Sequence, residues 1–258
     1  EREMIEQLQL GSLHIVKTSA SPLEGFIPEM ALFTVPYVFE DHAHLWETLD
    51  GKIGQDLLKA GKEKGVVGLC YYDAGSRSFY TKNKPIETPA DLKGLKIRVQ
   101  NSKTAMQMVE AMGGAPTPIA YGELYTSLEQ GVVDGAENNP PSLLTSRHYE
   151  ICKYYALDEH SAVPDVVLIG ETTWSGLTQA QQTLIQKAAN DSATYQRELW
   201  AKENQRALEE LAAAGVEISH PDKTPFQASV KALHDSYEGT AVGGLLNRIQ
   251  QSRATAAN

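Results

Sequence analysis

The sequence predicts an α/β protein with two lobes. Short apolar runs alternate with helix-period segments through nearly the whole chain, and this alternation is typical of strands that are connected by helices in largely parallel sheets. A length of 258 residues allows two lobes of ordinary size. Residues 178–214 contain neither Gly nor Pro. They can therefore form one helix that is longer than a single compact lobe and runs across both lobes.

The strands and helices expected along the chain follow from local patterns of residue type. Helices are expected at 3–10 and 51–64, and another is expected to begin at an N-cap residue, Asn101, and to end at Gly113 and Gly114. Apolar runs of strand length predict strands at 13–16, 66–72, 95–99, 116–120, 132–136 and 165–169.

The segment 178–214 has a helix start signal at one end and a stop signal at the other. Thr178 fits an N-cap, and Gly215 fits the residue after a helix end. At 1.5 Å per residue the segment would span roughly 55 Å. Two helices that break near Asn190 and Asp191 are the alternative. We favour one continuous helix that bridges the lobes.

Composition and charge exclude several classes of function. The net charge of −10 argues against a nucleic acid or an anionic membrane as partner, and an acidic protein that binds an anion must do so through local cations. No apolar run approaches the roughly 18 residues that a membrane span requires. The only two cysteines, Cys70 and Cys152, do not form a zinc motif. We expect two buried thiols rather than a disulfide.

The chain has no motif that demands catalysis. It contains no Gly-x-Ser-x-Gly elbow, no phosphate-binding Gly-rich loop and no His-Glu-x-x-His. The sequence therefore favours a binding protein, with an α/β enzyme as the alternative from a different class.

Arg98 is the clearest candidate for a binding residue. It lies within the apolar run 95–99, where it alternates with Ile97 and Val99, and a buried guanidinium must be compensated. One interpretation is an internal ion pair with an acidic side chain. The other is a clamp for a ligand carboxylate, because the planar fork of N–H donors matches a carboxylate with two parallel hydrogen bonds.

Other polar residues lie at the ends of apolar runs, where ligands of open α/β sheets bind. Arg77 follows the run 66–72 and by itself would be a surface arginine, and Asn138 would by itself be a helix cap. Further candidates at such ends are Lys17, Ser19 and Asp165.

Three stretches together resemble one family. Residues 88–99 (TPADLKGLKIRV), 121–138 (YGELYTSLEQGVVDGAEN) and 33–39 (FTVPYVF) resemble, in order and spacing, segments of the solute-binding proteins of bacterial tripartite (TRAP) transporters, of the dicarboxylate-binding type. The resemblance extends along nearly the whole chain.

The resemblance implies a periplasmic binding protein with two α/β lobes, two crossing strands and a long helix that spans both lobes. It implies that Arg98 holds a carboxylate with help from Asn138, that Arg77 lies near the ligand and that Tyr121 lines the cleft. The implied partners are a small organic acid and the TRAP membrane permease subunits, and we expect a monomer without a cofactor.

The resemblance also suggests boundaries. The first lobe is expected to comprise 1–75 and 164–203, and the second 76–163 and 204–258 with the C-terminal helices. Family members have a strand, a helix and a further strand before the position of Glu1. We therefore expect that this sequence lacks that part of the protein, any ligand contacts within it, and a signal peptide.

Two segments, 154–165 and 76–80, resemble family members that bind hexuronates such as D-glucuronate or D-galacturonate. A sugar acid requires hydrogen-bond acceptors as well as a cation, and the candidates for its hydroxyls are Glu137, His160, Asp165 and Gln100. A C4-dicarboxylate is the alternative, with Lys17 as the second cation, and sialate is a further one.

Overall fold

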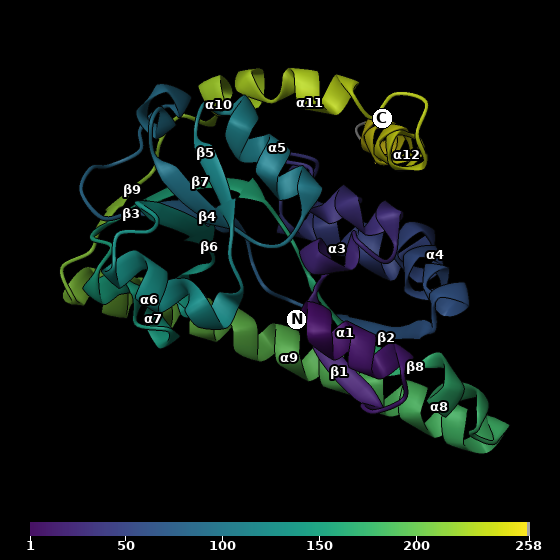
Figure 1. The fold of residues 1–258 in the computed structure, drawn as a ribbon. Coiled ribbons are helices and arrows are strands. Elements are labelled where there is room, and N and C mark those ends of the chain that lie inside the picture. Colours follow the sequence, from purple (N-terminus) through teal and green to yellow (C-terminus); the bar gives the residue numbers. More distant parts are fainter. Residues whose placement is uncertain (257–258) are drawn as a thin grey trace.

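The computed structural model describes residues 1–256, and the side chains of residues 1–251. It contains two sheets, each in its own lobe (Figure 1). The first sheet has the order β1-β8-β2, with strands β1 (Ile15–Ser19), β8 (Asp165–Gly170) and β2 (Val66–Tyr72). The second has the order β5-β4-β6-β3-β7-β9, with strands β5 (Ala115–Pro118), β4 (Lys96–Val99), β6 (Gly135–Asn138), β3 (Arg77–Thr81), β7 (Tyr154–Ser161) and β9 (Glu217–Ser219).

The strand directions differ from the sequence-based expectation of largely parallel sheets. In the first sheet β8 is antiparallel to both of its neighbours, and in the second sheet β3 is antiparallel to β6 and β7. Parallel pairing is found for β4 with β5, β4 with β6 and β7 with β9. The mixture arises because the chain crosses directly between the sheets, from β2 to β3 and from β7 to β8, without a helix in the connection.

Helices surround each sheet. The first lobe contains α1 (Arg2–Gln9), α2 (Ala20–Leu23), η1 (Pro28–Phe33), α3 (His42–Asp50), α4 (Lys52–Ala60), η2 (Lys62–Lys64) and α8 (Glu171–Ser175). The second contains η3 (Pro89–Leu92), α5 (Lys103–Ala111), η4 (Tyr121–Glu123), α6 (Leu124–Glu129), α7 (Pro140–Thr145), η5 (His148–Glu150), α10 (Lys223–Ser229) and α11 (Lys231–Asp235).

The C-terminal helix α12 (Ala241–Ala256) returns to the first lobe. Its residues Val242, Leu246 and Ile249 belong to the same buried cluster as Leu32 and Phe33 of η1. The sequence-based division assigned 204–258 to the second lobe, whereas the buried face of α12 packs against the core of the first lobe.

The start of α5 differs by one residue from the expectation. The N-cap is Ser102 rather than Asn101, because the Ser102 hydroxyl accepts a hydrogen bond from the backbone N–H of Ala105 at 3.0 Å. The helix ends at Ala111, and Gly113 then takes the left-handed conformation (φ +93°) that glycine adopts without steric cost.

A single helix, α9 (Gln179–Ala213), runs along both lobes, as the sequence predicted (Figure 1). Its 35 residues are unbroken at Asn190 and Asp191, and Thr178 caps it together with Gln181. On the first lobe, side chains of α9 bind β2 and the residue after it: Gln186 donates to the carbonyl of Leu69, the Tyr72 hydroxyl donates to Ser192, and the Gln196 amide bonds both the N–H and the carbonyl of Asp73. On the second lobe, α7 packs against α9.

The two cysteines are both free and buried, as expected. Cys70 belongs to the cluster between the first sheet and α9, and Cys152 to a core cluster of the second lobe. Burial raises the pKa of the Cys70 thiol to about 11 and that of Cys152 to about 12, so both thiols are protonated at neutral pH.

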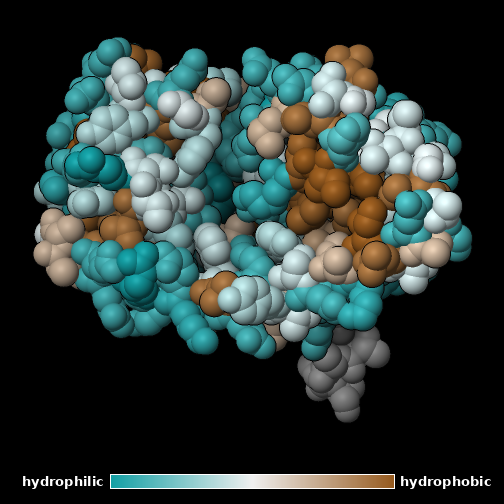
Figure 2. Space-filling model, turned by 90° about the horizontal axis from the view of Figure 1, so that it is seen from below, coloured by the Kyte–Doolittle hydropathy of each residue, from teal (hydrophilic) through white to brown (hydrophobic). Residues whose placement is uncertain are grey.

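Seen from the side of α9, the surface is hollowed between the two halves (Figure 2). Hydrophobic surface gathers on the half that contains the first lobe, and the other half is largely hydrophilic. Within residues 1–256, no helix combines the length and the apolar composition that crossing a membrane requires.

Candidate ligand-binding site

Arg98 is a buried cation that has no acidic partner among the residues that the structure describes. It lies on β4, between β5 and β6, and is 1% exposed. Its Nε–H donates to the carbonyl of Ile119 at 2.9 Å, and Nη1 has no hydrogen-bond partner among the described residues. Burial lowers the pKa of the guanidinium. The internal ion pair that the sequence left open for Arg98 is therefore not formed by the described residues.

Arg77 is the arginine that forms an internal ion pair. It begins β3 and is only 6% exposed, so it is not the surface arginine that its local pattern alone would indicate. Its Nε and Nη2 both bind the Glu137 carboxylate, and Nη2 also donates to the Glu137 carbonyl at 2.7 Å. Burial alone would lower the pKa of Arg77, but the charge of Glu137 and the hydrogen bonds to it raise it.

Asn138 is oriented by Arg77. Its Oδ1 accepts hydrogen bonds from Nη1 of Arg77 at 3.0 Å and from the backbone N–H of Asn139 at 2.9 Å. The cap of α7 is Asn139, whose Oδ1 accepts from the N–H of Ser142, so the interpretation of Asn138 as a helix cap was wrong. Because the oxygen of the Asn138 amide is occupied, its Nδ2 group is the part that can donate to a ligand.

Glu137 continues into a buried network that reaches the first lobe. His160 lies with Nε2 at 3.5 Å from Glu137 Oε2 and with Nδ1 at 2.8 Å from Asp158 Oδ2. The hydroxyl of Tyr37, which precedes α3 in the first lobe, donates to Asp158 at 3.3 Å, and the N–H of Tyr37 donates to the His160 carbonyl at 2.7 Å. The sequence reasoning did not name Asp158 or Tyr37 as functional residues, although both lie in segments that carried the family resemblance.

The pKa values of His160 and Glu137 are shifted in the directions that keep both residues charged. Burial alone would lower the pKa of His160, but Asp158 and Glu137 outweigh burial and raise it to about 9. Burial alone would raise the pKa of Glu137, but Arg77 and His160 lower it to about 2. At neutral pH the network therefore contains an imidazolium and a carboxylate.

The raised pKa of His160 predicts a loss of stability at alkaline pH. Because the folded value of about 9 lies above the unfolded value of about 6.5, the stabilisation is fully present below pH 6.5 and is lost as pH rises toward 9. We expect the unfolding free energy to fall across this range, and His160→Gln to flatten that part of the profile. Urea titrations at several pH values test this. Asp73 also raises the pKa of His42, so His42 adds to the alkaline loss of stability in the wild type and in His160→Gln alike. If the two proteins lost stability in parallel as pH rises, the assignment to His160 would be contradicted.

A second polar group lies in the first lobe, where β1 and β8 are paired. Lys17 forms an ion pair with Asp165, so it is not a free cation. Ser19, which pairs with Asp165 in the sheet, donates its backbone N–H to Oε1 of Glu1 at 3.0 Å. The Thr18 hydroxyl donates to the same oxygen at 3.4 Å.

Glu1 lies near the candidate site, and the sequence reasoning did not name it. Its carboxylate is close enough to raise the pKa of Arg77, Arg98 and Asp165. Burial is the larger cause of the raised pKa of Asp165, and Lys17 opposes it. Glu1 thus lies near Asp165 of the first lobe and near the two arginines of the second. An acidic residue at the start of an amphipathic helix gives no local signal of such a role.

Aromatic side chains lie beside Arg98. Its guanidinium carbon is 5.7 Å from the centre of the Tyr121 ring, and Tyr121 is 39% exposed, with its hydroxyl 2.6 Å from Ser146 Oγ. The buried His148 is 2.9 Å from the Tyr80 hydroxyl, and burial and the charge of Arg98 lower its pKa to about 4. Gln100, directly after β4, is buried.

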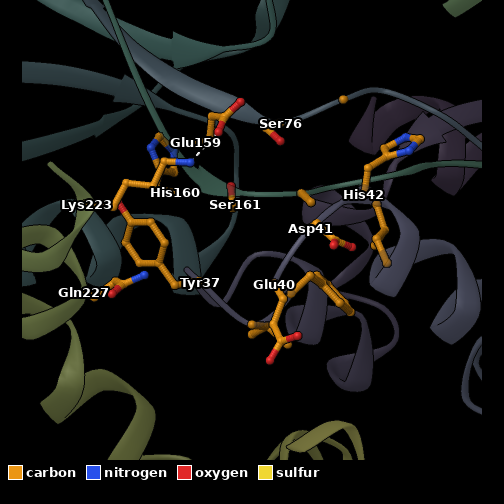
Figure 3. Close-up of a pocket in the computed structure, with 15 residues that line it drawn as sticks. Tyr37, Glu40, Asp41, His42, Ser76, Glu159, His160, Ser161, Lys223 and Gln227 are labelled. Carbon is orange, nitrogen blue, oxygen red and sulfur yellow. Dashed lines mark hydrogen bonds and ion pairs between the residues drawn. The ribbon is translucent and has the colours of Figure 1, made fainter. Parts of the chain in front are cut away.

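A separate cavity of about 370 Å³ lies between the two lobes near the strand crossings (Figure 3). Its wall includes Tyr37 and His160, and an ion pair between Lys223 of α10 and Glu159. Arg98, Arg77 and Asn138 do not line it, so it is distinct from the site around Arg98, and His160 is the member of the buried network that lies in its wall. Among the described residues, no cluster of three or more His, Cys, Asp or Glu side chains is placed to hold a metal ion.

Known proteins share this architecture. Residues 1–240 match the model of the family described as bacterial extracellular solute-binding protein, family 7 (DctP). A TRAP periplasmic solute-binding protein from Bradyrhizobium sp., in complex with α/β-D-galacturonate, is 42% identical; the match covers 97% of this chain and 84% of that chain, with a TM-score of 0.95. One from Pseudomonas putida F1 with bound D-glucuronate is 40% identical, with coverages of 97% and 82% and a TM-score of 0.93. One from Polaromonas sp., bound to D-erythronate, is 33% identical, with coverages of 97% and 83% and a TM-score of 0.94.

These matches confirm the fold, the binding function and the periplasmic location that the resemblance implied, and they favour a binding protein over an enzyme. The family implies an organic acid as ligand and membrane permease subunits as partners. The chain belongs to the bacterial extracellular solute-binding protein family 7, and it is a periplasmic solute-binding protein of a TRAP transporter.

Proposed function

We propose that this protein captures a hexuronate, such as D-glucuronate or D-galacturonate, for uptake through its TRAP permease. The observation that carries the proposal is the guanidinium of Arg98, which is buried, charged and without an anionic partner in the described residues. A buried cation in this state is compensated when a ligand carboxylate binds.

Each polar group has a role in this proposal. Arg98 binds the carboxylate with its fork of N–H groups, and Asn138 donates from Nδ2. Arg77 uses four of its five N–H groups on Glu137 and Asn138, so one Nη1–H remains for the ligand. Tyr121 covers one face of the sugar ring. The hydroxyl groups of the ligand bind Glu1, Asp165, Ser19 and Gln100. Glu1 is an acceptor that the sequence analysis did not include.

We assign Glu137 and His160 a positioning role. The Glu137 carboxylate binds Arg77, and Nδ1 of His160 binds Asp158, so these two residues act on the ligand through Arg77 and Asn138.

The charges of the site support a sugar acid over a C4-dicarboxylate. The dicarboxylate alternative required Lys17 as a second cation, but Lys17 is already paired with Asp165. The solved relatives with bound galacturonate, glucuronate and erythronate carry hydroxyl-rich ligands with a single carboxylate. Glu1 and Asp165 provide acceptors for hydroxyl groups, and the negative charge of Glu1 would repel a second carboxylate.

The proposal includes a monomer whose lobes, 1–75 with 164–203 and 76–163 with 204–258, enclose the ligand. The connections between β2 and β3 and between β7 and β8 are where the lobes would bend toward one another. Because α12 packs on the first lobe, the second boundary would fall before that helix.

Thermal shift measurements with a set of acids test the proposal. A ligand present at 100 times its Kd stabilises the folded protein by about 2.7 kcal/mol, which corresponds to a rise in Tm of about 5–10 °C for a chain of this size. We expect D-glucuronate or D-galacturonate to produce such a rise and succinate or malate to produce none. A rise with the dicarboxylates alone would overturn the proposal.

A further inference from the structure

The carboxylate of Glu24 joins the two lobes at a place outside the chain connections. Glu24 ends α2 of the first lobe, directly after Leu23, which is buried in the core of that lobe. Its Oε2 accepts a hydrogen bond from the Ser102 hydroxyl, and its Oε1 accepts one from the Thr104 hydroxyl at 3.1 Å. The backbone N–H of Thr104 lies 3.3 Å from both carboxylate oxygens. Ser102 and Thr104 belong to the second lobe, so these hydrogen bonds cross from one lobe to the other.

All three donors lie at the start of α5. Ser102 is the N-cap of this helix, and Thr104 lies in its first turn. The first N–H groups of a helix have no partner within the helix and carry partial positive charge, so a carboxylate is stabilised there. The Tyr237 hydroxyl is 2.6 Å from Thr104 Oγ1. Because the single hydroxyl hydrogen of Thr104 is directed to Glu24, Tyr237 is the donor in this pair, and the Thr104 hydroxyl is held in the orientation that Glu24 requires.

The contact lies close in sequence to candidate ligand-binding residues on both sides. In the first lobe, Ser19 is the N-cap of α2, the short helix that Glu24 ends. In the second lobe, Gln100 follows β4, and the N-cap of α5 comes two residues later. A ligand that binds both lobes and the carboxylate of Glu24 therefore require the same approach of the lobes.

We propose that Glu24 is a positioning residue for ligand binding, which binds the start of α5 when the lobes approach one another and holds the cleft closed without touching the ligand. This inference rests on the proposed function and goes beyond it, because it concerns retention of the ligand rather than its recognition. A contact that forms only in the closed arrangement raises the fraction of molecules that can hold the ligand, and the apparent Kd falls by the same factor. Glu24 is half-buried, so water replaces part of these hydrogen bonds when the lobes separate and limits the factor.

Glu24→Gln tests the proposal. The amide keeps the size of the side chain but replaces one acceptor oxygen with an NH2 group, which faces the donors of α5. We expect the Kd of D-glucuronate and the Kd of D-galacturonate to rise by the same factor of about tenfold, because Glu24 does not contact the sugar. The rise should appear mainly in the dissociation rate. Calorimetric titration measures the two Kd values, and stopped-flow mixing measures the rates.

A substitution on the opposite lobe provides the decisive control. Ser102→Asp keeps a favourable N-cap but places a second carboxylate against Glu24, so the Kd should rise while the Tm of the ligand-free protein stays at the wild-type value. In this background Glu24→Gln should lower the Kd, because its amide donates to the new carboxylate. A residue that served only the fold of its own lobe would change the Kd in the same direction in both backgrounds. Glu29→Gln, which alters a half-buried glutamate in the first turn of η1, should leave the Kd unchanged.

The outcomes distinguish this inference from the proposed function. Wild-type protein that binds neither uronate would overturn the proposed function and this inference with it. If the wild type binds a uronate, an unchanged Kd in Glu24→Gln, or a change in the same direction in both backgrounds, would overturn only the inference about Glu24. A factor that differs between the two uronates would place Glu24 in contact with the ligand and would also overturn it. Ser102→Asp alone leaves Glu24 in place, so an unchanged Kd in that variant would contradict the inference even where Glu24→Gln does not fold.

Discussion

Replacing Arg98 with lysine is expected to abolish most of the affinity while leaving the ligand-free protein as stable as before. Lysine keeps the positive charge but loses the planar fork that makes two parallel hydrogen bonds to a carboxylate. Loss of one partner of a buried, hydrogen-bonded charge pair costs about 2–5 kcal/mol of binding, or roughly 30-fold to several-thousand-fold in Kd. Calorimetric titration with D-glucuronate or D-galacturonate measures this loss.

The melting temperature of the same variant is the decisive control. No acidic side chain among the described residues binds Arg98, so none is left unpaired in Arg98→Lys. The Tm of the ligand-free variant should therefore match that of the wild type. A variant with a lowered Tm and nearly wild-type affinity would show that Arg98 serves the fold rather than the ligand.

Replacing Arg77 with methionine is expected to lower the stability of the ligand-free protein, which Arg98→Lys should leave unchanged. The change leaves the Glu137 carboxylate buried without the arginine that binds it at two nitrogens. Removing one member of a buried ion pair typically costs about 3–5 kcal/mol of folding stability, which corresponds to a fall in Tm of about 10 °C for a chain of this length. Urea denaturation of the ligand-free protein measures it.

A double variant tests whether the unpaired carboxylate causes the instability. Arg77→Met/Glu137→Leu removes both charges, and an apolar replacement of a buried pair is often neutral or stabilising. We expect it to recover most of the stability that Arg77→Met loses. An Arg77→Met protein as stable as the wild type would mean that the pair contributes nothing to the fold.

The features that sequence reasoning predicted well depend on neighbouring residues. Helix α9 follows from the cap at Thr178 and the absence of Gly and Pro over the next turns. Strand β2 occupies the predicted range, because its apolar run is bounded by Gly65 and by the polar residues that begin at Asp73. Arg98 could be singled out because a charge inside an apolar run requires a partner or a ligand.

The partners of the charged residues could not be predicted in this way. Which arginine is neutralised depends on the pairing of β3 with β6, which brings Arg77 beside Glu137 across 60 residues of sequence. The pairing of Lys17 with Asp165 likewise depends on the antiparallel register of β1 and β8. The sequence shows the number of charges, and only the register shows which of them remain uncompensated.

The long helix limits the ways in which one lobe can move against the other. Gln186, Ser192 and Gln196 fix α9 to β2 and to Asp73, and α7 packs on the same helix farther along. We expect a helix that is attached to two lobes, which two short connections also join, to resist sliding of the lobes and twisting about its own length. Rotation about the line through the two connections is the motion that this arrangement would leave. The separation of the lobes would then vary along a single coordinate, so that one distance would report the state of the whole molecule to a membrane partner that contacts both lobes.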